Sequence, residues 1–199
     1  MTESQSHGFL FEEQVKQGIS KYLDSVTINY TNKWDIPPIS VKSFKFDISK
    51  SNNRVYFGSI ENMFKIQDGF FLALIGYEQK GRVKEVVFSD FIFIEVKDLQ
   101  NLKGELELKE LEMLSTKIKS FKEGFHEEAR EWYKSILPEY SMKTSFQINF
   151  KVDSKKQRRI QCSLTIEELY KKLKRELILV NKLNINNIDS NPRERNTLG

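Results

Sequence analysis

An acidic residue and a lysine stand close together in residues 30–46, which read YTNKWDIPPISVKSFKF. Asp35 ends a run in which apolar and polar residues alternate, and Lys42 belongs to a second such run after Pro37 and Pro38. A carboxylate that faces a lysine across a tight connection between strands holds a divalent metal beside a cation that stabilises a phosphate oxyanion. The spacing therefore predicts half of a site for phosphodiester hydrolysis, with Asp35 on the metal and Lys42 on the phosphate.

A second metal ligand must come from another part of the chain. Glu12 is the first candidate, because it lies beside Phe11 in the first turn of a predicted helix and can turn inward. Glu61 is the second candidate, and a main-chain carbonyl is a further possible ligand.

Glu95 and Lys97 form an alternative site, because a single residue separates an acid from a lysine there. Asp68 or Asp90 would complete this site from upstream. We take Asp35, Lys42 and Glu12 as the leading set, and the alternative stays open.

Periodic apolar residues predict the elements that must position these side chains. Stripes at helical spacing predict helices over 8–23, 106–119 and 125–137, the last ended by Pro138, and a final helix that starts with the capping pair Thr165 and Glu168. Alternating or continuous apolar runs predict strands over 26–30, 39–42, 55–58, 70–77, 83–88, 91–96, 145–153 and 158–164. Strands placed among helices without regular alternation indicate a mixed α/β fold, with a central mixed sheet flanked by helices and a β-hairpin in the C-terminal half.

The composition indicates one globular domain. With 199 residues, of which 39% are hydrophobic, the chain can bury a core, and we expect a single domain over 1–180 followed by a loose tail over 181–199. The single cysteine excludes an internal disulfide framework, and no apolar run approaches the roughly 20 residues that span a bilayer. We therefore expect a cytoplasmic protein without a membrane partner.

Charge and short motifs narrow the function classes only slightly. The net charge of +4 is a mild excess, which does not by itself indicate nucleic acid. The chain has no GxGxxG, GxxxxGK[ST], HExxH or CxxC motif, so the sequence signals for dinucleotide, P-loop and zinc-protease sites are absent.

Residues 147–164, which read QINFKVDSKKQRRIQCSL, predict a hairpin with one apolar and one polar face. A two-stranded ribbon of this kind fits the major groove of DNA, where Arg binds guanine and Gln or Asn binds adenine. A solvated face usually mixes Glu with Lys, so the absence of acids from the six positions of the polar face favours a nucleic-acid partner. The polar face would display Gln147, Asn149, Lys151, Arg159, Gln161 and Ser163.

Cations at the turn of this hairpin extend the predicted interface. Lys155, Lys156 and Arg158 would hold phosphates, which position a protein on DNA without reading its sequence. Arg159 and Gln161 would read base edges. The predicted DNA-binding set is Lys151, Lys155, Lys156, Gln157, Arg158, Arg159 and Gln161.

Three separate segments, roughly half of the chain together, resemble type II restriction endonucleases of the PD-(D/E)XK nuclease superfamily. The run KVDSKKQRRIQCS over 151–163 resembles a segment of such enzymes, and WDI at 34–36 with SVK at 40–42 resembles their active-site block. The spacing of Gly8, Phe11, Glu12 and Val15 resembles the first helix of the superfamily.

The resemblance implies a restriction-endonuclease-like mixed sheet flanked by helices, Mg²⁺-dependent cleavage of double-stranded DNA at a short sequence, and commonly a homodimer. A cognate DNA methyltransferase in the host would protect the same sequence. The chain departs from the family pattern at Ser40, where the family has Asp or Glu two residues before the lysine. A non-cleaving DNA-binding protein of the same fold is therefore the alternative, and a scaffold whose basic hairpin binds an acidic protein is a third hypothesis.

Overall fold

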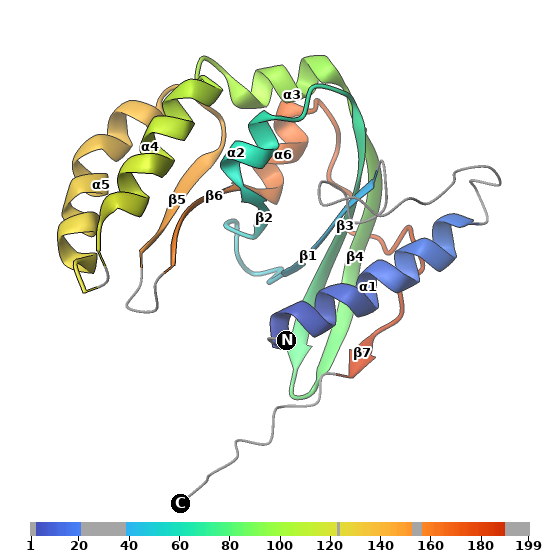
Figure 1. Cartoon of the computed structure of the whole chain (residues 1–199). Helices are drawn as coiled ribbons and strands as arrows, with labels where there is room; N and C mark the ends of the chain where they lie inside the picture. Colours follow the sequence, from blue (N-terminus) through green and yellow to red (C-terminus); the bar gives the residue numbers. More distant parts are fainter. Residues whose placement is uncertain (1–2, 21–38, 123, 153–156, 190–199) are drawn as a thin grey trace, which may run out of the picture. The chain divides into compact units, whose positions relative to one another are not determined.

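A computed structural model describes residues 3–20, 39–122, 124–152 and 157–189 (Figure 1). Residues 21–38, with the expected strand over 26–30, and residues 190–199 of the expected tail lie outside the described part. The chain divides into two compact units, each built from segments far apart in the sequence. The expectation of a single domain over 1–180 stays a prediction. The first unit comprises Met1–Asn53, Phe70–Phe93 and Leu177–Gly199, and the second comprises Arg54–Gly69 and Ile94–Glu176.

The first unit contains a curled four-stranded mixed sheet with the strand order β1-β3-β4-β7. β1 and β3 pair in parallel, whereas β4 and β7 pair antiparallel. Parallel neighbours need a crossover, and the chain between β1 and β3 supplies β2 and α2 to the second unit. The elements of the first unit are α1 (Glu3–Ser20), β1 (Ile39–Lys45), β3 (Phe70–Lys80), β4 (Val83–Ile94) and β7 (Ile188–Asp189).

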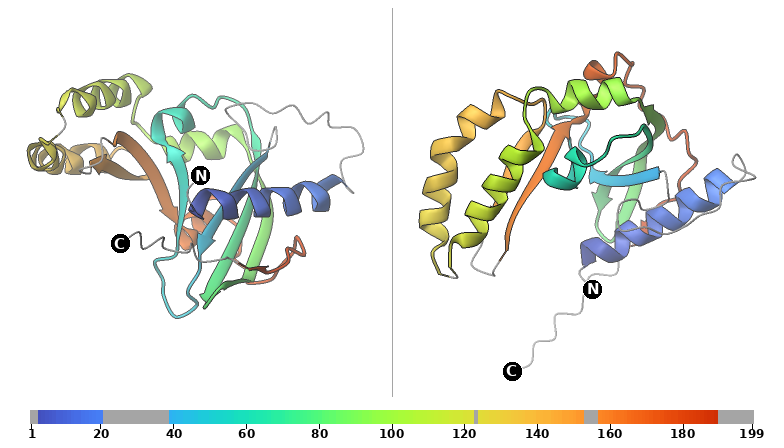
Figure 2. Two further views of the ribbon diagram at one scale, coloured as in Figure 1. Left: turned by 60° about the horizontal axis from the view of Figure 1, so that its bottom comes forward. Right: turned by 45° about the horizontal axis from the view of Figure 1, so that its top comes forward.

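Helix α1 packs across one face of this sheet (Figure 2). Phe11 and Val15 lie one helical turn apart, so both side chains reach the same face, and the Phe11 ring stacks on Tyr77 with 5.9 Å between centroids. β3 is an interior strand and is buried over 72–76, which confirms the predicted central strand. The buried core of the unit consists of Phe11, Val15, Ile39, Val41, Ala73, Ile75, Ile185 and Ile188.

Residues 181–189 pack onto the first unit and do not form a loose tail. Ile185 and Ile188 are buried in its core, and β7 pairs with the start of β4. The Asn181 amide oxygen accepts hydrogen bonds from Ser89 Oγ (2.6 Å) and from the Ile185 N–H (3.0 Å), while Asn181 Nδ2 donates to the Ile185 carbonyl (2.8 Å). The prediction of a loose tail is wrong for this segment, because an asparagine side chain supplies the partners that its backbone would otherwise lack.

The second unit contains a three-stranded antiparallel sheet with the strand order β2-β6-β5. β5 and β6 confirm the predicted hairpin, and the Thr165 hydroxyl accepts from the Glu168 N–H (3.2 Å) at the predicted start of the last helix. The elements of this unit are β2 (Arg54–Ser59), α2 (Ile60–Phe64), α3 (Val96–Lys103), α4 (Leu108–Ser120), α5 (His126–Ser141), β5 (Gln147–Val152), β6 (Arg158–Thr165) and α6 (Ile166–Lys172).

Helices α4 and α5 lie along one face of β5 and β6 (Figures 1 and 2). The predicted apolar stripe of α4 is buried at Leu111, Leu114 and Ile118. On the sheet, the Phe150 ring stacks on Tyr133 of α5 with 4.9 Å between centroids. The apolar face of the hairpin thus packs against helices, and a mixed α/β fold is confirmed.

A buried lysine links α2 to α3. Lys103 Nζ donates to the main-chain carbonyls of Phe64 (3.0 Å) and Ile66 (2.6 Å). The last carbonyls of a helix have no partner within it, so the ammonium group satisfies the carbonyl of Phe64, the last residue of α2, together with that of Ile66 just beyond the helix, while its own charge is taken out of water.

Two predicted boundaries differ from the structure. The strands over 83–88 and 91–96 are one strand, β4, because the polar residues between them find partners: Ser89 bonds with Asn181, and Asp90 pairs with Lys182 at 3.0 Å. Helix α5 continues past Pro138 to Ser141. The exposed position of Pro138 lets water replace the one helical hydrogen bond that proline removes.

Among the described helices, none combines the length and the apolar character that crossing a membrane requires.

Gly104 leaves no room for a side chain. It follows α3 with φ 65° and ψ −137°, and a Cβ there would lie 2.3 Å from the carbonyl oxygen of Lys143. We expect Gly104→Ala to lower the free energy of unfolding by at least about 3 kcal/mol, because the backbone conformation suits glycine and the clashing atom is main chain. Urea unfolding followed by circular dichroism measures the change.

Gly81→Ala is the matched control. Gly81 also has a positive φ, +58°, but nothing lies within 4 Å of a Cβ built there. This substitution should cost only about 1 kcal/mol. Equal losses in the two variants would contradict a steric constraint at Gly104.

Candidate functional site

β6 is the central strand of the three-stranded sheet, and its register with β5 and β2 determines which side chains share a face. Ser163 of β6 lies opposite both Gln147 of β5 and Tyr56 of β2. Two residues along β6, Gln161 lies opposite Asn149 of β5. Because side chains two residues apart point to the same side of a strand, the polar face predicted for the hairpin continues across β2.

The opposite face of the hairpin is apolar, as predicted. Ile148, Ile160 and Cys162 are each at most 3% exposed. The single cysteine is thus a core residue of this face. Helices cover this apolar face, so the candidate binding residues lie on the polar face of the sheet.

Two cations stand directly opposite each other on the polar face. Lys151 of β5 pairs in register with Arg159 of β6, and both side chains are exposed. Within the described residues neither side chain has an ion-pair partner, and no Asp or Glu occurs in β2, β5 or β6. Like charges directly across a strand pair destabilise a sheet. Without a ligand, the repulsion between Lys151 and Arg159 therefore destabilises the sheet, and a bound anion would relieve it.

Two amide side chains of the polar face, those of Asn149 and Gln161, differ in their hydrogen bonds. Asn149 Nδ2 donates to Ser163 Oγ (2.9 Å) and to the Gln147 carbonyl (3.1 Å). The Gln161 side chain is half-buried and makes no hydrogen bond to another described residue. Ser163 is fully buried between two strands, so the expectation that it is displayed is wrong.

Arg158 and Arg159 serve opposite faces of β6. The Arg158 guanidinium donates to the main-chain carbonyls of Gln157 (3.1 Å) and Lys122 (3.3 Å). Arg158 therefore ties the hairpin to the segment that follows α4, whereas Arg159 is exposed on the polar face. Alternation along the strand separates the two adjacent guanidinium groups.

The remaining residues of the predicted set lie at the turn. Gln157 is exposed just before β6, and Lys155 and Lys156 lie outside the described residues. The structure thus brings Lys151, Arg159 and Gln161 together and places Arg158 on the other face, whereas the phosphate contacts expected of Lys155 and Lys156 stay a prediction.

Lys42 lies in the middle of β1 and is half-buried, with the buried Ser40 two residues before it. Ile39 and Val41 point from the same strand into the core that α1 covers. Alternation therefore places Ser40 and Lys42 together on the other face of the sheet, as the sequence predicts.

The structure does not bring Glu12 to the same face as Lys42. Glu12 is half-buried on α1 next to Phe11, and α1 covers the Ile39 side of the sheet. Asp35 lies outside the described residues, so its pairing with Lys42 stays a prediction. Glu61, the second candidate ligand, lies in the first turn of α2 in the second unit.

The described side chains of β1 do not fit a magnesium site by themselves. Ser40 offers a neutral hydroxyl and Lys42 a cation, whereas Mg²⁺ prefers carboxylate oxygens and water. Among the described residues, no group of three or more His, Cys, Asp and Glu side chains comes together. A metal site beside Lys42 therefore depends on residues such as Asp35.

The alternative pair Glu95 and Lys97 forms an ion pair at the start of α3. Glu95 is the N-cap residue and Lys97 the second residue of the helix, with 2.9 Å between Oε2 and Nζ. Its hydrogen bond to Glu95 raises the pKa of Lys97. Of the two upstream acids, Asp90 is buried against Lys182, and Asp68 is exposed before β3. Exposed ion pairs of this kind are common on protein surfaces.

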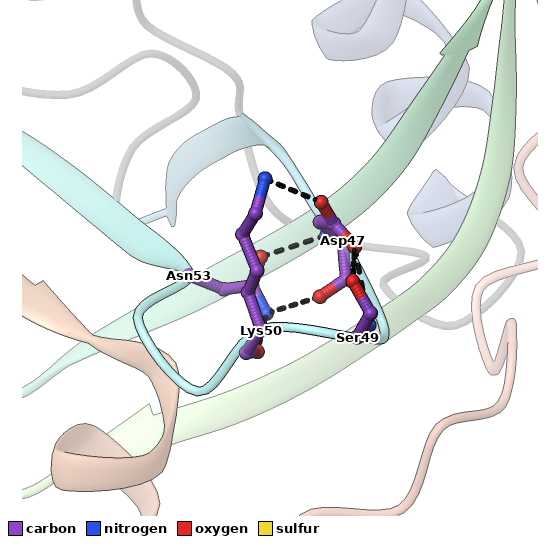
Figure 3. Close-up of polar contacts among 4 residues, drawn as sticks. All are labelled: Asp47, Ser49, Lys50 and Asn53. Carbon is purple, nitrogen blue, oxygen red and sulfur yellow. Dashed lines mark hydrogen bonds and ion pairs between the residues drawn. The ribbon is translucent and has the colours of Figure 1, made fainter.

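A compact polar loop follows β1 (Figure 3). The Asp47 carboxylate accepts hydrogen bonds from Ser49 Oγ (2.6 Å) and the Ser49 N–H (3.1 Å) and pairs with Lys50 Nζ (2.7 Å). Asn53 is buried and bonds with both the N–H (2.7 Å) and the carbonyl (3.0 Å) of Asp47. Hydrogen bonds from Lys50 and Ser49 lower the pKa of Asp47 from 3.8 to about 2.

Sequence reasoning missed the contribution of β2 to the polar face. Arg54 and Tyr56 lie on that face, because Arg54 is in register with Thr165 and Tyr56 with Ser163. Their segment reads RVYFGS and contains no acid, which is the same signal that marked the hairpin. Nothing in the sequence indicates that this strand pairs with one about a hundred residues later.

The lowered pKa of Asp47 has a consequence at acid pH. The folded value lies below the ordinary one, so the stabilisation from these contacts is complete above pH 3.8 and is lost as the pH falls towards 2. We expect the Asp47 carboxyl to remain ionised at pH 3, which ¹³C NMR titration of the carboxyl carbon measures.

Lys50→Met removes the first of these contacts and should raise the pKa of Asp47 towards 3.8. Lys45→Met is the matched control, because Lys45 is a nearby exposed lysine outside the loop. A titration of Asp47 near 3.8 in the unchanged protein would contradict the loop geometry.

Comparison of the chain with protein-family models, with curated proteins and with solved structures finds no match. We therefore infer function from the chemistry and the positions of the described side chains.

Proposed function

We propose that the protein is a site-specific deoxyribonuclease that binds double-stranded DNA through the polar face of its three-stranded sheet. One observation carries the proposal: Lys151 and Arg159 stand opposite each other on an exposed face whose three strands contain no acid. Such a face attracts a polyanion, because phosphate charges replace the repulsion between the two cations with attraction.

The tip of the hairpin has the width that a major groove accepts. β2 ends at Ser59, which lies opposite Gln161, so only β5 and β6 continue from there to Lys151 and Arg159. The major groove is about 12 Å wide and admits a two-stranded ribbon. In this position Arg159 can bind the O6 and N7 atoms of guanine, and Gln161 can bind adenine through its amide.

Lys42 is the residue that we assign to cleavage. Its half-buried ammonium, in the middle of a strand of the mixed sheet, can stabilise the negative charge that develops on a phosphate under attack. A mixed sheet with helices on it agrees with the fold that the resemblance to PD-(D/E)XK nucleases implies. We also propose that cleavage requires Mg²⁺, with Asp35, which lies outside the described residues, as the metal ligand.

The wider setting follows from the same resemblance. We propose a homodimer that acts in the cytoplasm, together with a host methyltransferase that modifies the same DNA sequence without forming a stable complex with the enzyme.

A DNA-binding protein that does not cleave is the second candidate. Ser40, which is 9% exposed, occupies the position two residues before Lys42 at which the family carries an acid. A hydroxyl at this position is a poor metal ligand, so the sheet face would then act by itself as a binding module.

Cleavage of supercoiled plasmid in the presence of Mg²⁺ distinguishes the two candidates. We expect discrete fragments from the unchanged protein, none from Asp35→Ala, and a rate lower by about 100- to 1,000-fold for Lys42→Met, because a charge on the transition state loses its partner. Both variants should bind duplex DNA normally.

Glu95→Gln and Lys97→Met are the controls, and both should cut as the unchanged protein does. Loss of cleavage in these two variants, with normal cleavage by Asp35→Ala, would move the site to α3. No cleavage under any condition, with intact duplex binding, would favour the second candidate.

Duplex binding tests the polar face independently of cleavage. We expect Arg159→Gln to weaken binding of the preferred sequence by about 1–3 kcal/mol, because a bidentate base contact is lost. Lys151→Gln should lower the slope of log K against log salt by about 0.9, since one phosphate contact is lost. Fluorescence anisotropy over a salt series measures both effects.

Arg158→Gln is the matched control, because it removes an adjacent guanidinium from the other face of β6. It should leave the affinity unchanged once protein stability is taken into account. Equal losses for Arg158→Gln and Arg159→Gln would contradict binding through the polar face. Tight binding of acidic protein rather than of DNA would favour the scaffold hypothesis.

A further inference from the structure

We propose that Arg54 and Tyr56 of β2 form a second subsite of the DNA interface, which binds a phosphate of the DNA backbone. The inference rests on the proposed DNA-binding function and adds two residues that the hairpin does not contain. It follows from the position, exposure and partners of the two side chains and from the width of the sheet at this point.

Pairing with β6 places both residues on the face that carries Lys151 and Arg159. Tyr56 lies opposite Ser163, and Arg54 lies opposite Thr165, so both lie on the polar side of β6. Tyr56 is 49% exposed and Arg54 is partly exposed. Neither side chain has a hydrogen-bond or ion-pair partner among the described residues.

The backbone after Tyr56 is irregular and leads to the end of β2 at Ser59. The register with β6 shifts between Tyr56 and Gly58, and Gly58 has φ +86°. Irregularities of this kind bend a strand and redirect its side chains. Ser59 then caps α2 by accepting a hydrogen bond from the Asn62 N–H (3.4 Å), so Arg54 and Tyr56 are the exposed polar side chains that β2 adds to the face.

The width of the sheet determines which part of DNA these residues can reach. Neighbouring strands lie about 4.8 Å apart, so three strands with their own thickness measure about 14 Å, more than the width of about 12 Å of the major groove. The two-stranded tip, up to Gln161, where β2 ends, therefore fits the groove, whereas the three-stranded part that carries Arg54 and Tyr56 remains at its rim. The rim is formed by the phosphate backbones, and base edges lie out of reach there.

The spacing along the sheet agrees with one continuous interface. Ser163, which is opposite Tyr56, is the fourth residue after Arg159 along β6, and this corresponds to about 13 Å. Duplex DNA rises about 3.4 Å per base pair, so the two positions lie about four base-pair steps apart. A guanidinium group binds phosphate through two parallel N–H groups, and a phenol hydroxyl adds one donor.

Salt-dependent binding of a duplex by three variants tests the subsite. We expect Arg54→Gln to bind about tenfold more weakly and to lower the slope of log K against log salt by about 0.9, because one phosphate contact is lost. Arg54→Lys should keep the slope. Tyr56→Phe should bind a few-fold more weakly with the slope unchanged, because an uncharged donor is lost.

Tyr56→Ala separates a phosphate contact from stacking on a base. A hydroxyl that binds phosphate predicts equal losses for Tyr56→Phe and Tyr56→Ala. A normal affinity for Tyr56→Phe with a loss for Tyr56→Ala would overturn the assignment, because a ring that stacks on a base keeps its function without the hydroxyl.

Comparing Arg54→Gln with Arg159→Gln separates loss of the β2 subsite from loss of the whole DNA interface. An unchanged slope for Arg54→Gln, with weaker binding by Arg159→Gln, overturns the subsite and leaves the hairpin interface intact. Normal binding by both variants overturns DNA binding through this face altogether. Titration with excess DNA gives the active fraction of each variant, so partial misfolding does not alter the slope that is compared.

Discussion

The antiparallel register of β6 with two neighbours is the constraint on which the candidate interface depends. It sets Arg159 opposite Lys151 and Ser163 between Gln147 and Tyr56. A shift by one residue would exchange the two faces of a strand. The rings and aliphatic side chains that pack against α4 and α5 oppose such a shift, because it would expose them to water. Core packing therefore holds the cations on the opposite face.

Polar side chains replace main-chain partners where regular pairing ends. Asn181 bonds with Ser89 and with the backbone of Ile185, and Asn53 bonds with both main-chain groups of Asp47. Lys103 binds two carbonyls at the end of α2 and just beyond it. Each case removes the cost of an unpaired buried polar group. These residues are thus explained by the fold, whereas Lys151 and Arg159 are not, since no described residue neutralises them. Only charged residues without a partner in the described part of the chain, such as Lys151 and Arg159, are evidence for a ligand.

Local patterns predicted the elements whose apolar residues recur within a few positions. The hairpin, the buried strand β3, the stripe of α4 and the cap at Thr165 all depend on neighbours in the sequence. The segment after Asn181 was expected to be loose because its asparagines carry no periodic pattern. Its order comes from Ser89, which is more than 90 residues away, so no local signal could reveal it.

The sequence by itself determined the two faces of β5 and β6, because alternation along a strand needs no knowledge of its neighbours. It also put Ser40 and Lys42 on one side of β1. Only the tertiary structure decided that β2 completes the sheet, that Arg158 bonds within the fold, and that α1 places Glu12 on the side opposite Lys42. The physical reason is that pairing and packing join residues far apart along the chain, whereas periodicity reports only which side chains of one element point the same way.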